Sequence, residues 1–172
     1  MPQNTRPDFT FVIPNTRWHR EGEGRYWNHI PYPEGLLTAV LRKNGYTVNH
    51  VDANTNNLTE DELYQILREK VGNVVGISAL SVEYRDAVHK TFAIIKKANS
   101  DVKTVLGGVY PSISPDVAKE DENLDFIVIA EGEKRLIDLM DCIKKKKPFD
   151  TVDGLHFRDD KKKWRYNPKT LA

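Results

Sequence analysis

Five short apolar segments, separated by stretches of helical periodicity, constrain the fold of this chain more than any other feature. The segments are residues 9–13, 46–51, 74–77, 104–108 and 126–129. Strands that alternate with helices favour one parallel sheet with right-handed crossovers. We therefore expect an α/β fold: a doubly wound, five-stranded parallel sheet of the flavodoxin-like type, with strand order 2-1-3-4-5.

The helices between these segments have recognisable starts and apolar faces. Pro33 suits the first turn of a helix whose apolar face is Leu36, Leu37, Val40 and Leu41. Later helices repeat the pattern: Thr59 and Glu62 form a capping box, Ser81 can cap the helix after the third strand, and Ser114-Pro115 begins a short one. Their apolar stripes are residues 63, 66, 67 and 71, then 84, 88, 91, 92 and 95, and last 136, 139, 140 and 143.

The pattern changes after Pro148. Residues 155–158 and 164–166 flank a charged turn and predict a β-hairpin, which is too small to carry a core of its own. We expect two parts, a ligand-binding domain over residues 1–150 and a hairpin linker over 151–172 that leads into a domain absent from this chain.

Composition excludes several classes of function. The 172 residues are 39% hydrophobic and 30% charged, with 26 basic and 25 acidic side chains and a net charge of +1. This balance gives no electrostatic reason to expect a nucleic acid or a membrane as partner, and we expect a cytoplasmic protein. Cys142 is the one cysteine, so the chain can form no internal disulfide and no cysteine-based metal or iron–sulfur site.

The carboxyl ends of parallel strands form the edge at which such sheets bind ligands. Four ends gather there: residues 15–17, 78–81, 107–110 and 131–133. Gly107 and Gly108 leave room for a flat ligand near the backbone. No catalytic constellation is present, so we expect a holder of a large ligand with no catalytic residues of its own. Each feature also has a purely structural explanation, such as a strand-to-loop turn at the glycines or a favourable helix dipole at Glu131 and Glu133.

Several motifs, in this order and spacing, resemble the N-terminal cobalamin-binding domain of cobalamin-dependent radical S-adenosylmethionine enzymes. They are Pro33-Glu34-Gly35-Leu36-Leu37, Asn44-Gly45-Tyr46-Thr47-Val48, Gly76-Ile77-Ser78-Ala79-Leu80, Gly107-Gly108-Val109-Tyr110-Pro111, Asp125-Phe126-Ile127-Val128 and Glu131-Gly132-Glu133. The resemblance covers roughly residues 9 to 170. It implies that cobalamin binds base-off, with its nucleotide tail at Ser78 and Gly107-Gly108. The cofactor-binding residues it implies are Asn15, Thr16, Arg17, Trp18, Ser78, Ala79, Leu80, Ser81, Gly107, Gly108, Val109, Tyr110, Glu131, Gly132 and Glu133.

The lower ligand of cobalt departs from the pattern of methyl-carrier domains, which use Asp-x-His-x-x-Gly after the first strand. Here Arg17 stands in place of the aspartate that would orient the imidazole of His19. We therefore favour a cobalt without a histidine ligand, its lower face covered by Trp18 or Arg17. A corrinoid carrier with His19 on cobalt is the alternative.

The resemblance also implies a partner: a radical S-adenosylmethionine domain in the same polypeptide, which would bring S-adenosylmethionine and a 4Fe-4S cluster. The cobalamin domain would present cobalt to it for methyl transfer or related radical chemistry. The three-cysteine motif of that domain is not in this chain. Two other hypotheses stay open: a stand-alone doubly wound module that binds a flavin or nucleotide, and a domain that serves only for protein interaction.

Overall fold

The computed structural model describes residues 6–19 and 31–169, and side chains over the same ranges except that of His19. One sheet, in the order β2-β1-β3-β4-β5-β6-β7, runs through it. Its strands are β1 (Phe9–Ile13), β2 (Val48–Asp52), β3 (Val74–Ser78), β4 (Lys103–Gly107), β5 (Phe126–Val128), β6 (Leu155–Arg158) and β7 (Trp164–Tyr166). The first five are parallel, which confirms the predicted fold and strand order.

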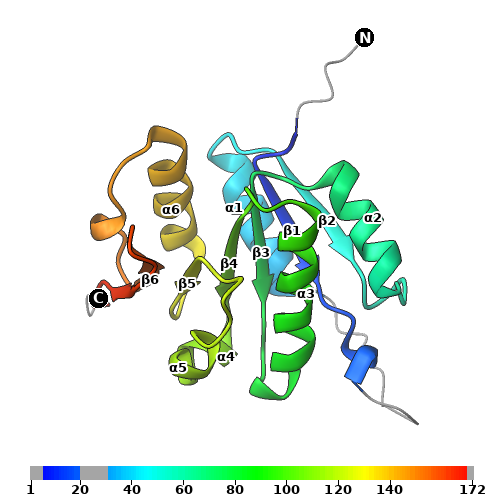
Figure 1. Cartoon of the computed structure of the whole chain (residues 1–172). Coiled ribbons are helices and arrows are strands. Elements are labelled where there is room, and N and C mark those ends of the chain that lie inside the picture. Colours follow the sequence, from blue (N-terminus) through cyan, green and yellow to red (C-terminus); the bar gives the residue numbers. More distant parts are fainter. Residues whose placement is uncertain (1–5, 20–30, 170–172) are drawn as a thin grey trace.

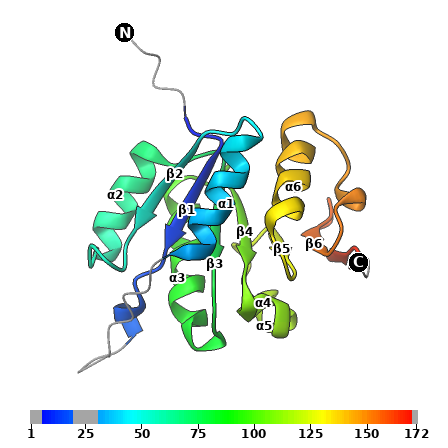
Figure 2. The same cartoon turned by 180° about the vertical axis from the view of Figure 1, so that it is seen from behind.

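Helices cover both faces of this sheet (Figures 1 and 2). The face seen in Figure 2 carries α1 (Tyr32–Lys43) and α6 (Glu133–Lys145), and the opposite face carries α2 (Glu60–Lys70) and α3 (Arg85–Ala98). Short helices α4 (Val109–Ile113) and α5 (Pro115–Ala118) connect β4 to β5, and 3₁₀ turns cover Thr16–His19, Val82–Tyr84 and Phe149–Thr151. No helix among the described residues combines the length and the apolar character needed to cross a bilayer.

Local chemistry sets the helix boundaries much as the sequence predicts. Thr59 accepts a hydrogen bond from the Glu62 backbone N–H, and the Glu62 carboxylate accepts one from the Thr59 backbone, so the capping box is present. Ser81 caps the 3₁₀ turn before α3 by accepting from the Glu83 N–H at 3.3 Å. The expected apolar face of α1 is wrong at one position: Leu36 is 39% exposed.

Each face of the sheet has its own hydrophobic core. Val75, Ile77 and Leu106 face α2 and α3, whereas Val74 and Val105 face α1 and α6. Successive side chains of a strand point to opposite faces, so odd and even positions of β3 and β4 belong to different layers. This alternation decides what lies at the strand ends.

The C-terminal hairpin is joined to the sheet rather than set apart from it. β6 pairs antiparallel with β5, and β7 with β6. Val152, Leu155 and Phe157 are buried in the same core as α1 and α6. Arg135 of α6 fixes the approach to β6 by donating to the carboxylate of Asp153 at 2.7 Å and to its carbonyl at 3.1 Å.

His156 is the buried polar residue of this hairpin. It is 6% exposed, its ring stacks on Tyr166 with centroids 4.2 Å apart, and its Nδ1 has no hydrogen-bond partner. Burial, with a smaller contribution from the nearby Lys119 charge, lowers the pKa of His156 from 6.5 to about 4. The folded chain therefore holds this imidazole neutral at pH values where the unfolded chain protonates it.

This difference predicts a stability that falls on acidification. Between about pH 6.5 and about pH 4 the unfolded state binds a proton that the folded state does not, so the free energy of unfolding decreases as the pH falls. The loss from this residue is at most about 3.5 kcal/mol, at about 1.4 kcal/mol per pH unit over the interval between the two pKa values. His156→Phe keeps the ring stack and removes the titration. Denaturant unfolding at several pH values should give a shallower pH dependence for the variant, and equal slopes would contradict the assignment.

Candidate functional site

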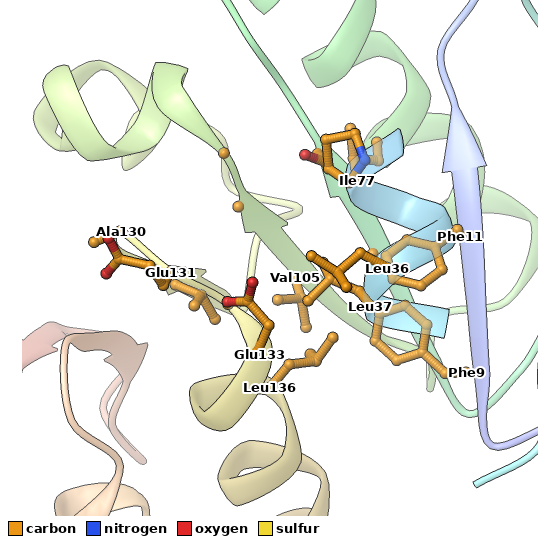
Figure 3. A pocket seen from close by; sticks show the side chains of 17 residues that line it. Phe9, Phe11, Leu36, Leu37, Ile77, Val105, Ala130, Glu131, Glu133 and Leu136 are labelled. Atoms are coloured by element: carbon orange, nitrogen blue, oxygen red, sulfur yellow. The ribbon is translucent and has the colours of Figure 1, made fainter. Parts of the chain in front are cut away.

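A pocket of about 160 Å³ opens at the carboxyl ends of the central strands, on the face covered by α1 and α6 (Figure 3). It lies over the ends of the paired strands β3 and β4, beside the Ser78 and Gly107-Gly108 positions singled out in the sequence. Its lining residues are Phe9, Phe11, Pro33, Leu36, Leu37, Gly76, Ile77, Ser78, Val105, Gly107, Gly108, Val128, Ala130, Glu131, Gly132, Glu133 and Leu136.

Small residues at alternate strand positions explain why this layer has a pocket at the strand ends. Ser78 and Gly107 pair in register at the ends of β3 and β4, and both line the pocket. Two pairs earlier, and on the same face of the sheet, Gly76 opposes Val105. A Cβ on Gly76 would lie 2.3 Å from Cζ of Phe9, so the glycine lets that ring rest on β3 and form part of the pocket wall. On the other face, Ile77 and Leu106 are buried in the core with α2 and α3.

Backbone hydrogen bonds fix the exit of β4 against the exit of β3. The Ala79 N–H donates to the Gly107 carbonyl at 2.9 Å, and the Tyr110 N–H donates to the Ala79 carbonyl at 2.9 Å. Gly108, with a φ of +96°, passes so close to Ala79 that a Cβ would lie 2.6 Å from the Ala79 oxygen. A side chain at position 108 therefore conflicts with both the dihedral and the space.

Ser112 joins the exits of β4 and β5. Its hydroxyl donates to the Gly108 carbonyl at 2.7 Å and accepts from the Ala130 N–H at 3.0 Å. Ala130 has a positive φ of 61°, so this hydrogen bond supports a bend that turns the chain toward Glu131 and α6. Ser112 thereby holds two sides of the pocket in place, a role that the sequence alone did not indicate.

A second, smaller hollow of about 30 Å³ lies beside the first, and Ser78 lines both. It is lined by Ile13, Pro14, Thr16, Glu34, Asn54, Ser78, Ala79, Leu80, Tyr84 and Val88. Glu34, in the first turn of α1, is only 3% exposed here. The two hollows therefore adjoin at Ser78.

The segment after β1 is bound to the loop between β2 and α2. Asn15 donates to the Leu58 carbonyl at 3.0 Å, and the indole N–H of Trp18 donates to the same oxygen at 2.9 Å. Thr16 donates from its hydroxyl to Asn54 at 3.0 Å, and the Arg17 N–H donates to the Asn15 side chain at 3.1 Å. None of residues 15–18 lines the larger pocket; Thr16 lines the smaller one.

The structure brings together six of the predicted site residues in the larger pocket: Ser78, Gly107, Gly108, Glu131, Gly132 and Glu133. Thr16, Ala79 and Leu80 line the smaller hollow with Ser78. Ser81 serves as a helix cap, and Val109 is 47% exposed on α4. The side chain of His19 lies outside the described residues, so its role as cobalt ligand stays a prediction.

Tyr110 is not brought to either hollow. It is 1% exposed in the core beneath α3, where its hydroxyl lies 3.1 Å from Nε2 of His89. Burial raises the pKa of Tyr110 to about 12. Because the chain enters α4 immediately after Gly108, the side chain at position 110 turns to the α3 face.

Glu131 and Glu133 give the α6 side of the pocket its negative charge. A hydrogen bond from its own backbone N–H, with Lys169 and Arg135 nearby, holds the pKa of Glu131 below its usual range. Its carboxylate lies 3.6 Å from Arg135 and 3.7 Å from Lys169. Glu131 therefore also ties α6 to the end of the hairpin. Within residues 6–19 and 31–169 no group of three His, Cys, Asp or Glu side chains is placed to hold a metal ion.

The apolar wall of the pocket is what sequence reasoning missed. Phe9, Phe11, Leu37, Val105 and Leu136 line it together with Leu36, whose exposure at the mouth explains why it is not part of the buried face of α1. Each sits in a segment that reads as ordinary core. The available clue to this pocket was that the small residues Gly76, Ser78 and Gly107 all lie on one face of the sheet, because side chains alternate along a strand.

Comparison with known proteins identifies the fold that carries this site. The family model described as the B12 binding domain matches residues 29–140, which is more than half of the chain. The chain belongs to the B12-binding domain family. That family is the one expected from the strand-end motifs.

Curated relatives of this B12-binding domain are much longer proteins. It is 34% identical over 135 residues to an anaerobic magnesium-protoporphyrin IX monomethyl ester cyclase of Rubrivivax gelatinosus, covering 77% of this chain and 24% of that protein. It is 27% identical over 157 residues to a cytidylyl-2-hydroxyethylphosphonate methyltransferase of Streptomyces wedmorensis, covering 80% and 29%. The chain thus spans about a quarter of the length of these relatives.

Solved structures share the fold over nearly the whole B12-binding domain. The radical S-adenosylmethionine methyltransferase TsrM from Kitasatospora setae, with cobalamin and a [4Fe-4S] cluster bound, superposes with a TM-score of 0.79 at 17% identity, covering 96% of this chain and 29% of TsrM. The cobalamin-dependent S-adenosylmethionine radical enzyme OxsB, with aqua-cobalamin bound, gives 0.75 at 23% identity, covering 97% and 23%. In both cases the matched part is a fraction of a larger chain.

The two adjacent glycines offer a matched test of the strand-end geometry. Gly108→Ala should lower the free energy of unfolding by about 1–3 kcal/mol, because the new Cβ meets the Ala79 backbone at a positive φ. Gly107→Ala should change it by less than about 1 kcal/mol, because a Cβ there would make only an ordinary van der Waals contact, 3.9 Å from the Val128 oxygen. Denaturant unfolding of both variants checks this prediction. Equal losses of unfolding free energy would contradict the close approach of Gly108 to the Ala79 backbone.

Proposed function

We propose that this B12-binding domain holds cobalamin base-off, with its nucleotide tail in the larger pocket and its corrin over the carboxyl ends of the strands. The observation that carries the proposal is the open pocket itself: about 160 Å³, largely apolar, between β3, β4, α1 and α6. Apolar cavities of about 150 Å³ accept aromatic rings the size of benzene. An aromatic base with its sugar at the open mouth suits this shape.

The residues around the pocket fit the parts of such a ligand. Ser78 can donate a hydrogen bond to the ring nitrogen that the base frees when it leaves cobalt. Gly107 and Gly108 have no side chains, so the ribose and phosphate can lie close to the backbone there. The deeper aromatic and aliphatic side chains suit the faces of a flat bicyclic ring.

The rim supports the second half of the proposal, a corrin lying over the strand ends. The large apolar side chains exposed at this rim come from the start of α1 and from the segments after β3 and β4, and exposed apolar patches commonly mark ligand sites. They are Tyr32, Leu36, Leu80, Val82, Val109 and Ile113. Such a surface suits the apolar edge of a macrocycle, while the loop ends around it offer polar groups to the corrin amides.

Cobalamin supplies a cobalt that can carry a methyl group. We propose that the domain presents this cobalt to a radical S-adenosylmethionine domain of the same polypeptide, which would hold S-adenosylmethionine and a 4Fe-4S cluster, for methyl transfer or related radical chemistry. The support is the domain's family and its likeness to about a quarter of TsrM and OxsB. In this arrangement the chain's own residues would bind and orient cobalamin, and the substrate would lie in the other domain.

Binding is tested by adding hydroxocobalamin to the purified chain and following its absorbance before and after desalting. Wild-type protein should keep the corrinoid. Leu36→Trp, at the exposed mouth of the pocket, should weaken binding at least about tenfold because the larger ring obstructs the entrance. Lys43→Trp, exposed at the far end of the same helix, is the matched control and should bind as wild type does.

Two results would contradict the proposal. A wild-type chain that emerges colourless from desalting would remove cobalamin as the ligand. Equal binding by Leu36→Trp and wild type would leave cobalamin bound elsewhere than in this pocket.

A further inference from the structure

The pocket changes character with depth. Figure 3 shows Phe9 and Leu136 at the end away from the strand termini, with Leu37 and Val105 above them. Phe9 is 1% exposed, and Val105 and Leu136 are each 4% exposed. These four side chains carry no hydrogen-bonding group, so the deep end is an apolar floor.

Polar side chains of the pocket lie nearer its mouth. Ser78 ends β3, and Glu131 and Glu133 stand at the start of α6. The helix rises 1.5 Å per residue, so the backbone at Leu136 lies about 4.5 Å deeper along α6 than at Glu133. A ring that fills the pocket therefore meets polar partners only along its outer part.

We propose that this floor makes the domain selective for the lower base of its corrinoid, favouring cobamides with a benzimidazole base over those with a purine base. The inference rests on the proposed function and adds to it which corrinoid the same site takes. The sugar of a cobamide is attached to the five-membered ring of the base, so the six-membered ring enters first. The free nitrogen of the five-membered ring then stays near Ser78 in either case.

The six-membered rings of the two bases differ in what they require from the floor. In dimethylbenzimidazole this ring carries two methyl groups and only carbon atoms. In adenine it carries two ring nitrogens and an amino group, which lose their water on burial and find no partner among Phe9, Leu37, Val105 and Leu136. Glu133 could accept a hydrogen bond from the amino group, but the two ring nitrogens would still lack a hydrogen-bond donor.

The test compares the dissociation constants of cobalamin and of adeninylcobamide for the purified chain, measured by absorbance titration under the same conditions. Cobalamin should bind on the order of tenfold to a hundredfold more tightly, because at least one buried polar group of adenine stays unpaired. Equal affinity, or tighter binding of the adeninyl form, would overturn the inference and leave the proposed function standing. Failure of both to bind would overturn the two together.

A pair of variants assigns the selectivity to the floor. Val105→Thr places one hydroxyl on the floor, where it can pair with a polar group of adenine. It should reduce the ratio of the two dissociation constants by at least about threefold. Val74→Thr adds the same hydroxyl in the same core, at a side chain 1% exposed that does not line the pocket, and should leave the ratio unchanged. A ratio unaffected by Val105→Thr, or equally affected by both variants, would contradict the role of the floor.

Discussion

The gap at the strand ends, in the layer between the sheet and helices α1 and α6, is the feature on which the rest of this structure depends. A parallel sheet covered on both faces normally fills each layer with branched apolar side chains. Here the α2 and α3 face follows that rule, with Ile77 and Leu106 buried at 2% and 0% exposure. On the other face, Ser78 and Gly107 stand side by side at the strand ends and supply almost no volume. A pocket results over these small residues, between α1 and α6.

That pocket keeps its shape because its edges are bonded to one another. The exits of β3 and β4 are linked through the Ala79 backbone, and Ser112 links β4 to the turn at Ala130. On the far side Arg135 and Glu131 bind α6 to the hairpin segment. A site held by backbone hydrogen bonds and an ion-pair network is largely formed before any ligand arrives, which lowers the ordering cost of binding.

Much of the fold was predictable from the sequence because its signals are local and repeated. Alternating apolar segments, the Thr59 capping box and right-handed crossovers lead directly to the observed order of the five parallel strands. The glycine pair after β4, singled out in the sequence for its lack of side chains, lines the larger pocket. The hairpin was predicted as a linker, and only its pairing with β5 reveals that it extends the sheet.

The site was less predictable because its parts come together through tertiary packing. Phe9 reads as a core residue and becomes pocket wall only because Gly76 lets its ring lie on β3. Tyr110 looks like a ligand contact next to two glycines, yet the helical turn that begins at Val109 carries it to the α3 face. Residues 15–18 follow the first strand as expected, but hydrogen bonds to the Leu58 loop hold them away from the larger pocket.

The central claim is that this pocket takes the lower base away from cobalt. Electron paramagnetic resonance of the chain with cob(II)alamin, its dimethylbenzimidazole labelled with ¹⁵N, tests it directly, because the label separates the base from any histidine nitrogen. Base-off binding predicts no splitting of the cobalt lines by ¹⁵N. A ¹⁵N doublet on those lines would mean that the base stays on cobalt, and would contradict base-off binding.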